Sequence, residues 1–259
     1  MKGITEMRTA VFSKRNLKEL LRDPLSYIFC LGFPIVMLLI MTIINKSIPP
    51  QANMTVFRID NLSGGIAVFG LSFVMLFAAL LLSQDRTGAF LTRLYASPMK
   101  AHEFIGGYYL PIVLLAVLQS LVTFTASFII AAAEKVEMNV GRTFLALLSL
   151  IPTAVMFIGF GLLFGSIFNS NAAPGICSII ISAAGILGGI WMDVESIGGG
   201  LQKVCLALPF YHSVRAARSI MAGTSDKLGT DLLIVGAYTL AALLLSIAAF
   251  RKNMKSDSK

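Results

Sequence analysis

The chain has few charged residues. Asp, Glu, Lys and Arg make up 13% of its 259 residues, whereas an average soluble domain carries roughly 25%. Hydrophobic residues make up 56%, and the mean hydropathy is +0.82. This composition excludes an ordinary soluble domain and indicates an integral membrane protein.

Residues that build metal and catalytic sites are scarce as well. The three cysteines, Cys30, Cys177 and Cys205, lie in apolar surroundings without the spacing of a metal site, and we interpret them as packing residues. The chain has two histidines, His102 and His212. It has no glycine-rich loop followed by Lys and Ser or Thr, the pattern that holds nucleotide phosphates. We therefore predict no metal site, no catalytic residue and no cofactor bound by this chain.

Long uncharged runs are what the sequence has instead. About 20 apolar residues in a helix cross the hydrocarbon core of a bilayer, and residues 143–192 form an uncharged run of 50. That run must fold back, and "NSNAAPG" at 169–175 offers the turn. We predict a single all-α transmembrane domain over residues 1–259, with six spans at 25–45, 62–84, 105–132, 143–168, 173–192 and 232–250.

Two pairs of glycines lie at a four-residue spacing within the fourth and fifth predicted spans. They are Gly161 with Gly165, and Gly185 with Gly189. Small residues at this spacing let two membrane helices approach closely, and we interpret both pairs as helix-packing residues.

Lys and Arg are distributed unevenly between the connecting segments. With the N-terminus inside, the cytoplasmic segments carry 13 of these residues and the outer segments carry 8, which fits the rule that positive charge stays inside. We therefore predict that both termini are cytoplasmic and that the first span stays in place as a signal anchor. The net charge of +8 then reflects topology and contact with anionic lipids, not the binding of nucleic acid.

The segment before the first span predicts a helix on the inner membrane surface over residues 5–22. One half of its helical wheel is apolar with two long lysines: Met7, Ala10, Val11, Lys14, Leu17, Lys18 and Leu21. The other half is polar and is expected to face away: Arg8, Arg15, Asn16, Glu19 and Arg22. Phe12 and Leu20 fit neither half, and Pro24 ends the helix. A plain basic anchor is the alternative.

A second polar segment, "LLSQDRTGAFLTRLYASPMKAHEFIGG" at 81–107, separates the second and third spans. We predict a short helix over residues 86–97, in which Gly88 allows close approach of a partner and which Pro98 ends. Its apolar side carries Phe90, Leu91 and Leu94, while Arg86 and Arg93 reach outward. A short helix fixed to two spans can transmit displacement; a solvated loop is the alternative.

Three segments, taken in this order, resemble the ABC-2 type permeases, the membrane subunits of one class of ATP-binding-cassette transporters. The first, "RNLKELLRDPLSYIFCLGFPIVMLLI" at 15–40, joins a basic helix to a span with a central Pro34, and its motif residues are Arg15, Leu17, Leu21, Arg22, Asp23 and Pro24. The second reads Asp85, Arg86, Gly88, Leu91, Arg93, Leu94, Pro98 and Glu103. The third, "LALPFYHSVRAARSIMAG" at 206–223, contributes Pro209, Tyr211, Arg215 and Arg218.

Two positions of the second segment depart from the pattern of the family. Asp85 stands where Glu is usual, and Ala89 stands where Thr is common. Neither change alters the charge, so the expected role of the segment is unaffected.

The resemblance implies a non-catalytic subunit that works with two copies of a separate ABC ATPase, which bind ATP and Mg. It also implies a second permease subunit, identical or related, among the lipids of the cytoplasmic membrane of a prokaryote. By the same resemblance, the segment after the second span docks on the ATPase, with 86–97 as the coupling helix. We therefore expect residues 85–103 and the helix 5–22 to form the ATPase contact together. Residues 196–223 are then re-entrant helices that enter the outer leaflet.

The expected transport pathway is lined by the second and fifth spans, with Phe69, Phe73, Phe77, Ser178 and Ser182. Such a lining suits an amphipathic cargo, and the outer segment 46–60 is too short to form a capture domain. We predict export of a small hydrophobic or amphipathic compound or peptide, such as a drug or antibiotic. Export of a lipid or a lipid-linked polysaccharide is the alternative within the family.

Two other classes of function stay open. An ion-coupled secondary carrier or a channel would work without an ATPase, but such a carrier normally has an ionisable group within its spans, and the six predicted spans contain none. An intramembrane enzyme would need a nucleophile with a base. The candidates for the base are His102 and His212, which is adjacent to Ser213; we interpret His212 as an interfacial polar residue.

Overall fold

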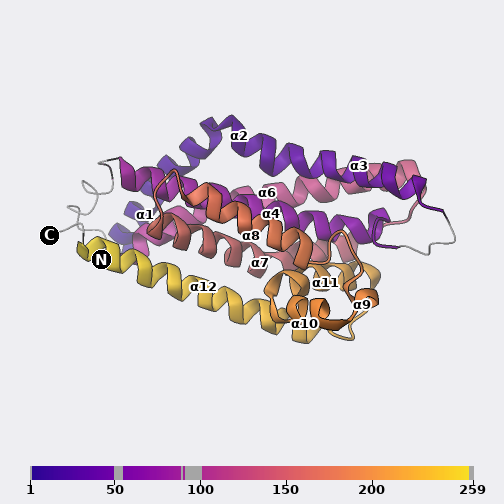
Figure 1. The fold of residues 1–259 in the computed structure, drawn as a ribbon. Coiled ribbons are helices and arrows are strands. Elements are labelled where there is room, and N and C mark those ends of the chain that lie inside the picture. Colours follow the sequence, from indigo (N-terminus) through magenta and orange to yellow (C-terminus); the bar gives the residue numbers. More distant parts are fainter. Residues whose placement is uncertain (1, 50–54, 89, 91–100, 257–259) are drawn as a thin grey trace.

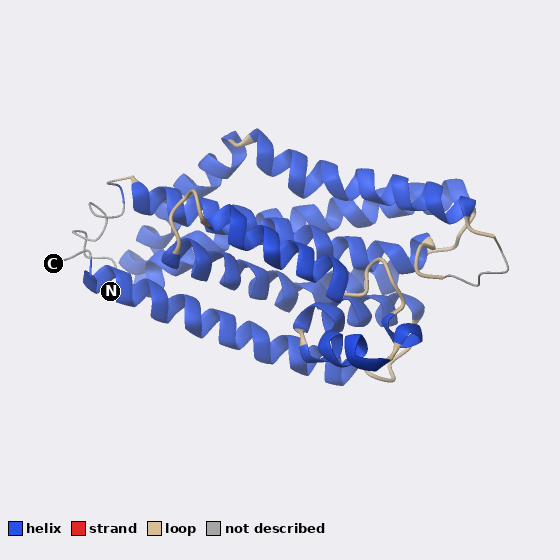
Figure 2. Ribbon diagram, viewed as in Figure 1, coloured by secondary structure: helices blue, strands red, loops and turns tan. Residues whose placement is uncertain are grey.

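The computed structural model describes residues 2–49, 55–88, 90 and 101–256. Within these ranges the fold is helical, and no strand occurs among the described residues (Figure 2). The predicted all-α class is therefore confirmed. The helices, in chain order, are α1 (Lys2–Arg22), α2 (Pro24–Tyr27), the π-helical turn η1 (Ile28–Gly32), α3 (Phe33–Ser47), α4 (Ile59–Thr87), α6 (Ala101–Glu134), α7 (Val140–Ile167), α8 (Ala173–Leu187), α9 (Val194–Ile197), α10 (Gly199–Ala207), α11 (Pro209–Ala222) and α12 (Leu228–Ser256).

Five helical segments of the described chain are long and apolar enough to cross a membrane. They are Pro24–Ser47, Ile59–Thr87, Glu103–Glu134, Val140–Ile167 and Leu228–Lys252. These segments contain five of the six predicted spans nearly complete. The chain is thus a multi-pass membrane protein.

The remaining predicted span, the fifth at 173–192, contains a helix shorter than expected. Its helix α8 has 15 residues, or about 22 Å of length at 1.5 Å per residue, against the roughly 30 Å of a hydrocarbon core. The helix ends at Leu187, and Gly189 follows with φ +67°, a left-handed conformation that turns the chain. The uncharged run continues past the end of this helix. Whether residues 173–192 cross the membrane stays a prediction.

Helix α4 lies at the centre of the bundle and packs against α3, α6, α7, α8 and α11 (Figure 1). The closest approach is made by α7. A Cβ on Gly161 would lie 2.3 Å from the carbonyl oxygen of Met75, and one on Gly165 would lie 2.6 Å from that of Ala79. Both glycines are therefore required by helix packing, as predicted. Gly189 lies outside any helix, so it does not extend a helical pair with Gly185, but a Cβ on it would lie 2.9 Å from Val194 of α9 and 3.1 Å from Tyr211 of α11.

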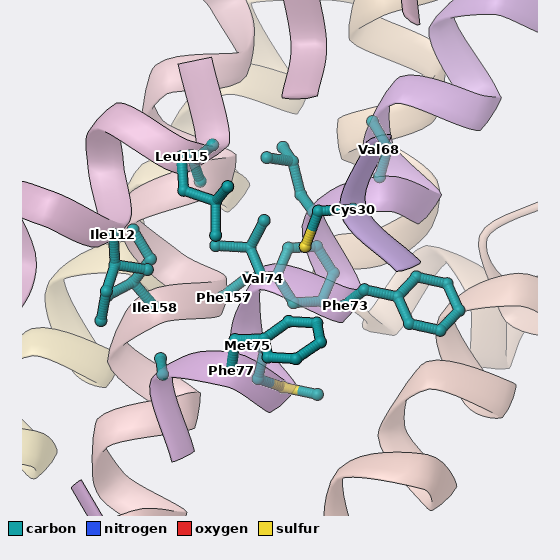
Figure 3. Close-up of a cluster of buried hydrophobic side chains, with 14 of the residues drawn as sticks. Cys30, Val68, Phe73, Val74, Met75, Phe77, Ile112, Leu115, Phe157 and Ile158 are labelled. Atoms are coloured by element: carbon teal, nitrogen blue, oxygen red, sulfur yellow. The ribbon is translucent and has the colours of Figure 1, made fainter. Parts of the chain in front are cut away.

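The interior between these helices is filled by large apolar side chains. Val74 and Met75 on α4 meet Phe157 and Ile158 on α7 and Ile112 on α6 (Figure 3). All three cysteines are buried and free, which confirms that they are packing residues. The apolar core holds the helices together, and the polar residues described below lie at the two ends of the bundle.

The two ends of the bundle differ. One end, which we call the terminal end, holds α1, the end of α4, the start of α6 and both chain termini (Figure 1). The other, the distal end, holds α9, α10, α11, the start of α4 and the turn between α6 and α7. The start of α1 and the end of α12 lie at the same end, and the cytoplasmic location of both termini stays a prediction.

Candidate functional site

A joint of three helices forms the candidate site at the terminal end. The Arg15 guanidinium of α1 donates two hydrogen bonds to the Asp85 carboxylate at the end of α4, with N–O distances of 2.6 and 2.7 Å. The Tyr108 hydroxyl of α6 donates to the same carboxylate at 2.7 Å. Asp85 is 5% exposed. The carboxylate therefore links helices that lie far apart in the sequence.

Apolar and polar contacts of α1 reinforce this joint. Phe12 lies 5.0 Å, centroid to centroid, from the Tyr108 ring and 5.9 Å from the Phe104 ring. The Asn16 amide donates to the carbonyl of Gly107 at 3.1 Å. A Cβ on Gly107 would lie 2.3 Å from the Phe12 ring, so a larger residue there would push α1 away.

The face of α1 that packs on the bundle differs from the predicted one. Its buried residues are Phe12, Ser13, Asn16 and Leu20. Arg15 and Asn16 thus point toward the protein, although we expected them to face away. The two apolar residues that fitted neither predicted half, Phe12 and Leu20, are the ones that pack. Val11 and Leu21 stay exposed at 67% and 55%.

The other surface-helix residues lie near the junction with the first span. Leu17 is half-buried and Arg22 is exposed. The Asp23 carboxylate accepts from the Leu25 amide at 3.1 Å and from the Ser26 hydroxyl at 2.7 Å, and Pro24 is the first residue of α2. This N-cap ends α1 and restarts the helix in a new direction.

Arg86 also points inward, where we expected it to reach outward. Its guanidinium donates to the carbonyls of Gly165 and Phe168 at 3.1 and 3.4 Å. These carbonyls belong to the end of α7, where unpaired C=O groups and the helix dipole favour a cation. Arg86 therefore fastens α4 to α7 through its Nη1, while its buried Nε has no hydrogen-bond partner among the described residues.

The predicted coupling helix 86–97 is only partly within the described residues. Helix α4 continues to Thr87, and Gly88 caps it with its amide donating to the Gln84 carbonyl at 2.9 Å. Asp85 and Arg86 thus belong to α4 and not to a separate helix. Leu91, Arg93, Leu94 and Pro98 lie outside the described residues. Glu103, in the first turn of α6, is 3% exposed.

The predicted pathway residues lie on two helices that pack against each other, α4 and α8. Phe69 and Phe73 on α4 lie 5.5 Å apart, centroid to centroid, and Phe33 and Trp191 pack on them. Phe77 is 4% exposed. Ser178 and Ser182 lie on the exposed side of α8. No hydrogen bond or ring contact among the described residues joins the serines to the phenylalanines.

At the distal end, the predicted re-entrant region 196–223 forms two short helices, α10 and α11, which meet at Leu208. Pro209 starts α11 and Tyr211 is buried. Arg215 donates to the Asp231 carboxylate at 2.6 and 2.9 Å and lies 5.0 Å over the Tyr211 ring. These hydrogen bonds raise the pKa of Arg215.

One residue of this distal cluster, Asp231, was missed by sequence reasoning, and another, His212, was given a different role. Asp231 is fully buried in the first turn of α12, and its carboxylate lies 2.6 Å from Nδ1 of His212. His212 is 2% exposed and is not the interfacial residue that we predicted. The available signal was Asp231 itself, a single acid placed one residue before a long apolar run.

A scan against protein-family models finds a match between residues 8–222 and the model for the ABC-2 type transporter. The chain belongs to the ABC-2 type transporter family. It is also 24% identical, over 247 residues, to the protein named "Putative transport permease YvfS" from Bacillus subtilis (strain 168). That alignment covers 92% of this chain and 95% of the relative.

Membership in the ABC-2 family has two direct consequences. The chain is the membrane subunit of an ABC transporter, and it works with an ABC ATPase. At both ends of the bundle, polar residues attach shorter helices to the spans of this membrane subunit.

The geometry around His212 does not support the enzyme alternative for this ABC-2 permease. Its Nδ1 faces Asp231, and its Nε2 lies 2.9 Å from the carbonyl of Leu206. The Ser213 hydroxyl donates instead to the Pro209 carbonyl at 3.0 Å. Neither ring nitrogen is left to accept a proton from Ser213, as a nucleophile and base pair requires. The side chain of His102 lies outside the described part of the chain.

Proposed function

We propose that the chain is the permease of an ATP-driven exporter of small hydrophobic or amphipathic compounds or peptides, such as drugs or antibiotics. The observation that carries the proposal is the joint of Arg15, Asp85 and Tyr108. The joint connects α1 to both helices that flank residues 88–100. A force applied to α1 or to that segment is therefore delivered to α4 and α6 together.

The ATPase docks, in this proposal, on the terminal end through the exposed side of α1 and residues 85–103. That side of α1 carries Lys14, Lys18 and Arg22, all exposed. It includes the half that we expected on the membrane surface, and the ATPase covers it in this proposal. Asp85, Arg86 and Glu103 act from within, because they are turned into the bundle. They transmit the movement of the ATPases to the spans, and they do not touch the partner directly.

The pathway is completed, in this proposal, by a second permease copy, identical or related. The phenylalanines of α4 and the serines of α8 share no hydrogen bond or ring contact among the described residues, and the partner copy brings such surfaces around one cargo. The outward side of α8 is apolar as well as polar, since Ile179 and Ile186 are 65% and 51% exposed. Two permeases and two ATPases form the working unit, with both termini in the cytoplasm of a prokaryote.

The test is transport by the full complex. The chain is co-expressed with its ABC ATPase, and inside-out vesicles are supplied with a hydrophobic dye, an amphipathic peptide or a lipid-linked oligosaccharide. We expect ATP-dependent accumulation of the dye or the peptide. ATP-dependent uptake of the oligosaccharide alone would favour lipid-linked export, and uptake that follows an ion gradient without ATP would overturn the proposal in favour of a secondary carrier.

A further inference from the structure

Arg218 on α11 has no carboxylate partner within 4 Å among the described residues. Its guanidinium donates instead to three backbone carbonyls, those of Asn61 at 3.0 Å, Gly189 at 2.9 Å and Ile190 at 3.2 Å. A guanidinium has five N–H donors, so two remain. Burial lowers the pKa of Arg218 to about 10, although the nearby charge of Asp193 acts in the opposite direction, and the group stays a cation at neutral pH.

Arg218 and Asn61 line two hollows of the distal end. The larger hollow has a volume of about 650 Å³ and lies between the start of α4, the turn between α6 and α7, and the end of α11. The smaller, of about 360 Å³, lies between α9, α11 and the turn before α12. The cation therefore faces space on two sides, and the carbonyls that hold it fix its position.

A second guanidinium lines the larger hollow. Arg142, in the first turn of α7, donates to the Ala222 carbonyl at 3.2 Å and also lacks a carboxylate within 4 Å among the described residues. The fit around it is close. Gly223 has φ +78°, and a Cβ there would lie 2.5 Å from the guanidinium carbon of Arg142. Glycine at this position thus makes room for the cation.

The acids of the larger hollow do not neutralise these two arginines. Asp60 is bound by Arg58, with N–O distances of 3.0 and 3.3 Å. Glu137 is exposed, as Arg142 is, and it forms no ion pair with Arg142 or Arg218 among the described residues. Neither arginine is therefore paired with an acid of the hollow, and each presents a planar guanidinium group, which matches the oxygens of a phosphate.

We propose that Arg142 and Arg218 form a binding site for a phosphate-bearing anion at the distal end of the permease. The source of the phosphate is either a lipid headgroup of the surrounding membrane or a soluble phosphate. Binding requires neither ATP nor the exported cargo, so the site can be tested apart from the proposed function.

The single tryptophan of the chain provides the measurement. Trp191 directly follows Ile190, whose carbonyl accepts from Arg218. The full chain, purified in an uncharged detergent, is titrated with dihexanoyl phosphatidylglycerol, dihexanoyl phosphatidylcholine and inorganic phosphate, and Trp191 fluorescence is followed. We expect saturable binding of phosphatidylglycerol, with phosphatidylcholine about tenfold weaker because its choline brings a positive charge to the arginines.

Two variants and a matched control locate the binding. Arg142→Gln removes an exposed guanidinium with one hydrogen bond to the protein, so the fold is kept, and it should weaken phosphatidylglycerol binding about tenfold. Arg218→Lys keeps the positive charge but loses the planar set of guanidinium N–H donors, and it should weaken binding as well. Lys203→Gln removes an exposed distal cation that lines neither hollow and should leave binding unchanged.

The outcomes separate the two sources. Tighter binding of phosphatidylglycerol than of inorganic phosphate assigns the site to a lipid headgroup, and equal affinities assign it to soluble phosphate. Absence of binding, or equal losses in Arg142→Gln and Lys203→Gln, overturns the site.

Discussion

The two ends of this permease both bury carboxylates, but they use them in different ways. At the terminal end, Asp85 accepts from Arg15 and Tyr108 and so connects α1, α4 and α6. At the distal end, Asp231 accepts from Arg215 and lies against His212, which fixes α11 to the start of α12. The terminal carboxylate joins a peripheral helix to two spans, whereas the distal one locks a short helix pair in place.

The difference also shows in solvent access. The side chains of Arg15 and Asp85 are 30% and 6% exposed, while those of Arg215 and Asp231 are 16% and 0% exposed. A partly exposed ion pair opens at a lower cost than a buried one, because water replaces part of what is lost. We therefore expect the terminal joint to open more readily than the distal cluster.

The largest effect is expected from Asp231→Asn. This change leaves Arg215 and His212 without their carboxylate in a fully buried place, and loss of one partner from a buried ion pair costs about 3–5 kcal/mol. Thermal unfolding of the purified chain in detergent measures the loss. Asp226→Asn, which changes an exposed acid of the same region, is the control and should be nearly neutral. Equal stability of the two variants would show that the distal cluster is not a lock.

A smaller loss is expected when the terminal joint is broken. Arg15→Gln and Asp85→Asn should each cost about 1.5–3 kcal/mol, the range for hydrogen bonds to charged groups, and a double-mutant cycle should show strong coupling between the two positions. Glu19→Gln is the internal control. Glu19 binds the same arginine at 2.6 Å but is 42% exposed, so its coupling should be about 0.3–0.5 kcal/mol.

The same terminal variants have a functional signature. If the joint transmits movement, Asp85→Asn should keep the ATPase bound while ATP-dependent transport falls. Normal transport by a complex with Asp85→Asn would remove the joint from the mechanism.

The two ends also differ in what could be predicted from the sequence. The spans follow from apolar runs that exceed the thickness of a bilayer, and five of them were found with small errors at their ends. The pairing of Arg15 with Asp85 joins residues 70 positions apart, and no local period reveals it. Phe12 and Leu20 did carry a signal, because two large apolar side chains that break an amphipathic pattern indicate a second packing face.

The distal cluster was missed for a related reason. Asp231 was placed in an outer segment because it ends the charged part of the sequence, and the helix α12 begins three residues earlier, at Leu228. An acid in the first turn of a helix is usually interpreted as an exposed residue that interacts favourably with the helix dipole. Only the packing of α11 against α12 shows that it is buried with Arg215 and His212.

Glycines at the two ends offer a further comparison. Gly165→Ala places a Cβ 2.6 Å from the Ala79 backbone, and the rigid helices cannot move aside, so a loss of about 1–3 kcal/mol is expected. Gly223→Ala meets the flexible, exposed Arg142 and a left-handed backbone, at a cost of about 1–2 kcal/mol. Gly229→Ala, with open space around it, is the control. Thermal unfolding in detergent ranks the three variants, and a ranking in which Gly165→Ala is the mildest would contradict the close contact of α4 and α7.

The smallest effect on stability is expected at the exposed side of α1. Lys14→Gln combined with Lys18→Gln should change the free energy of unfolding by less than about 0.5 kcal/mol per site, because both side chains are exposed and neither has an ion pair among the described contacts. If this side docks the ATPase, the double variant should copurify with less ATPase than the wild type at the same salt concentration. Lys203→Gln, an exposed cation of the distal end, should copurify normally. Equal copurification of the two would move the docking surface from α1 to residues 88–100, and the joint at Asp85 would then receive the force from that side alone.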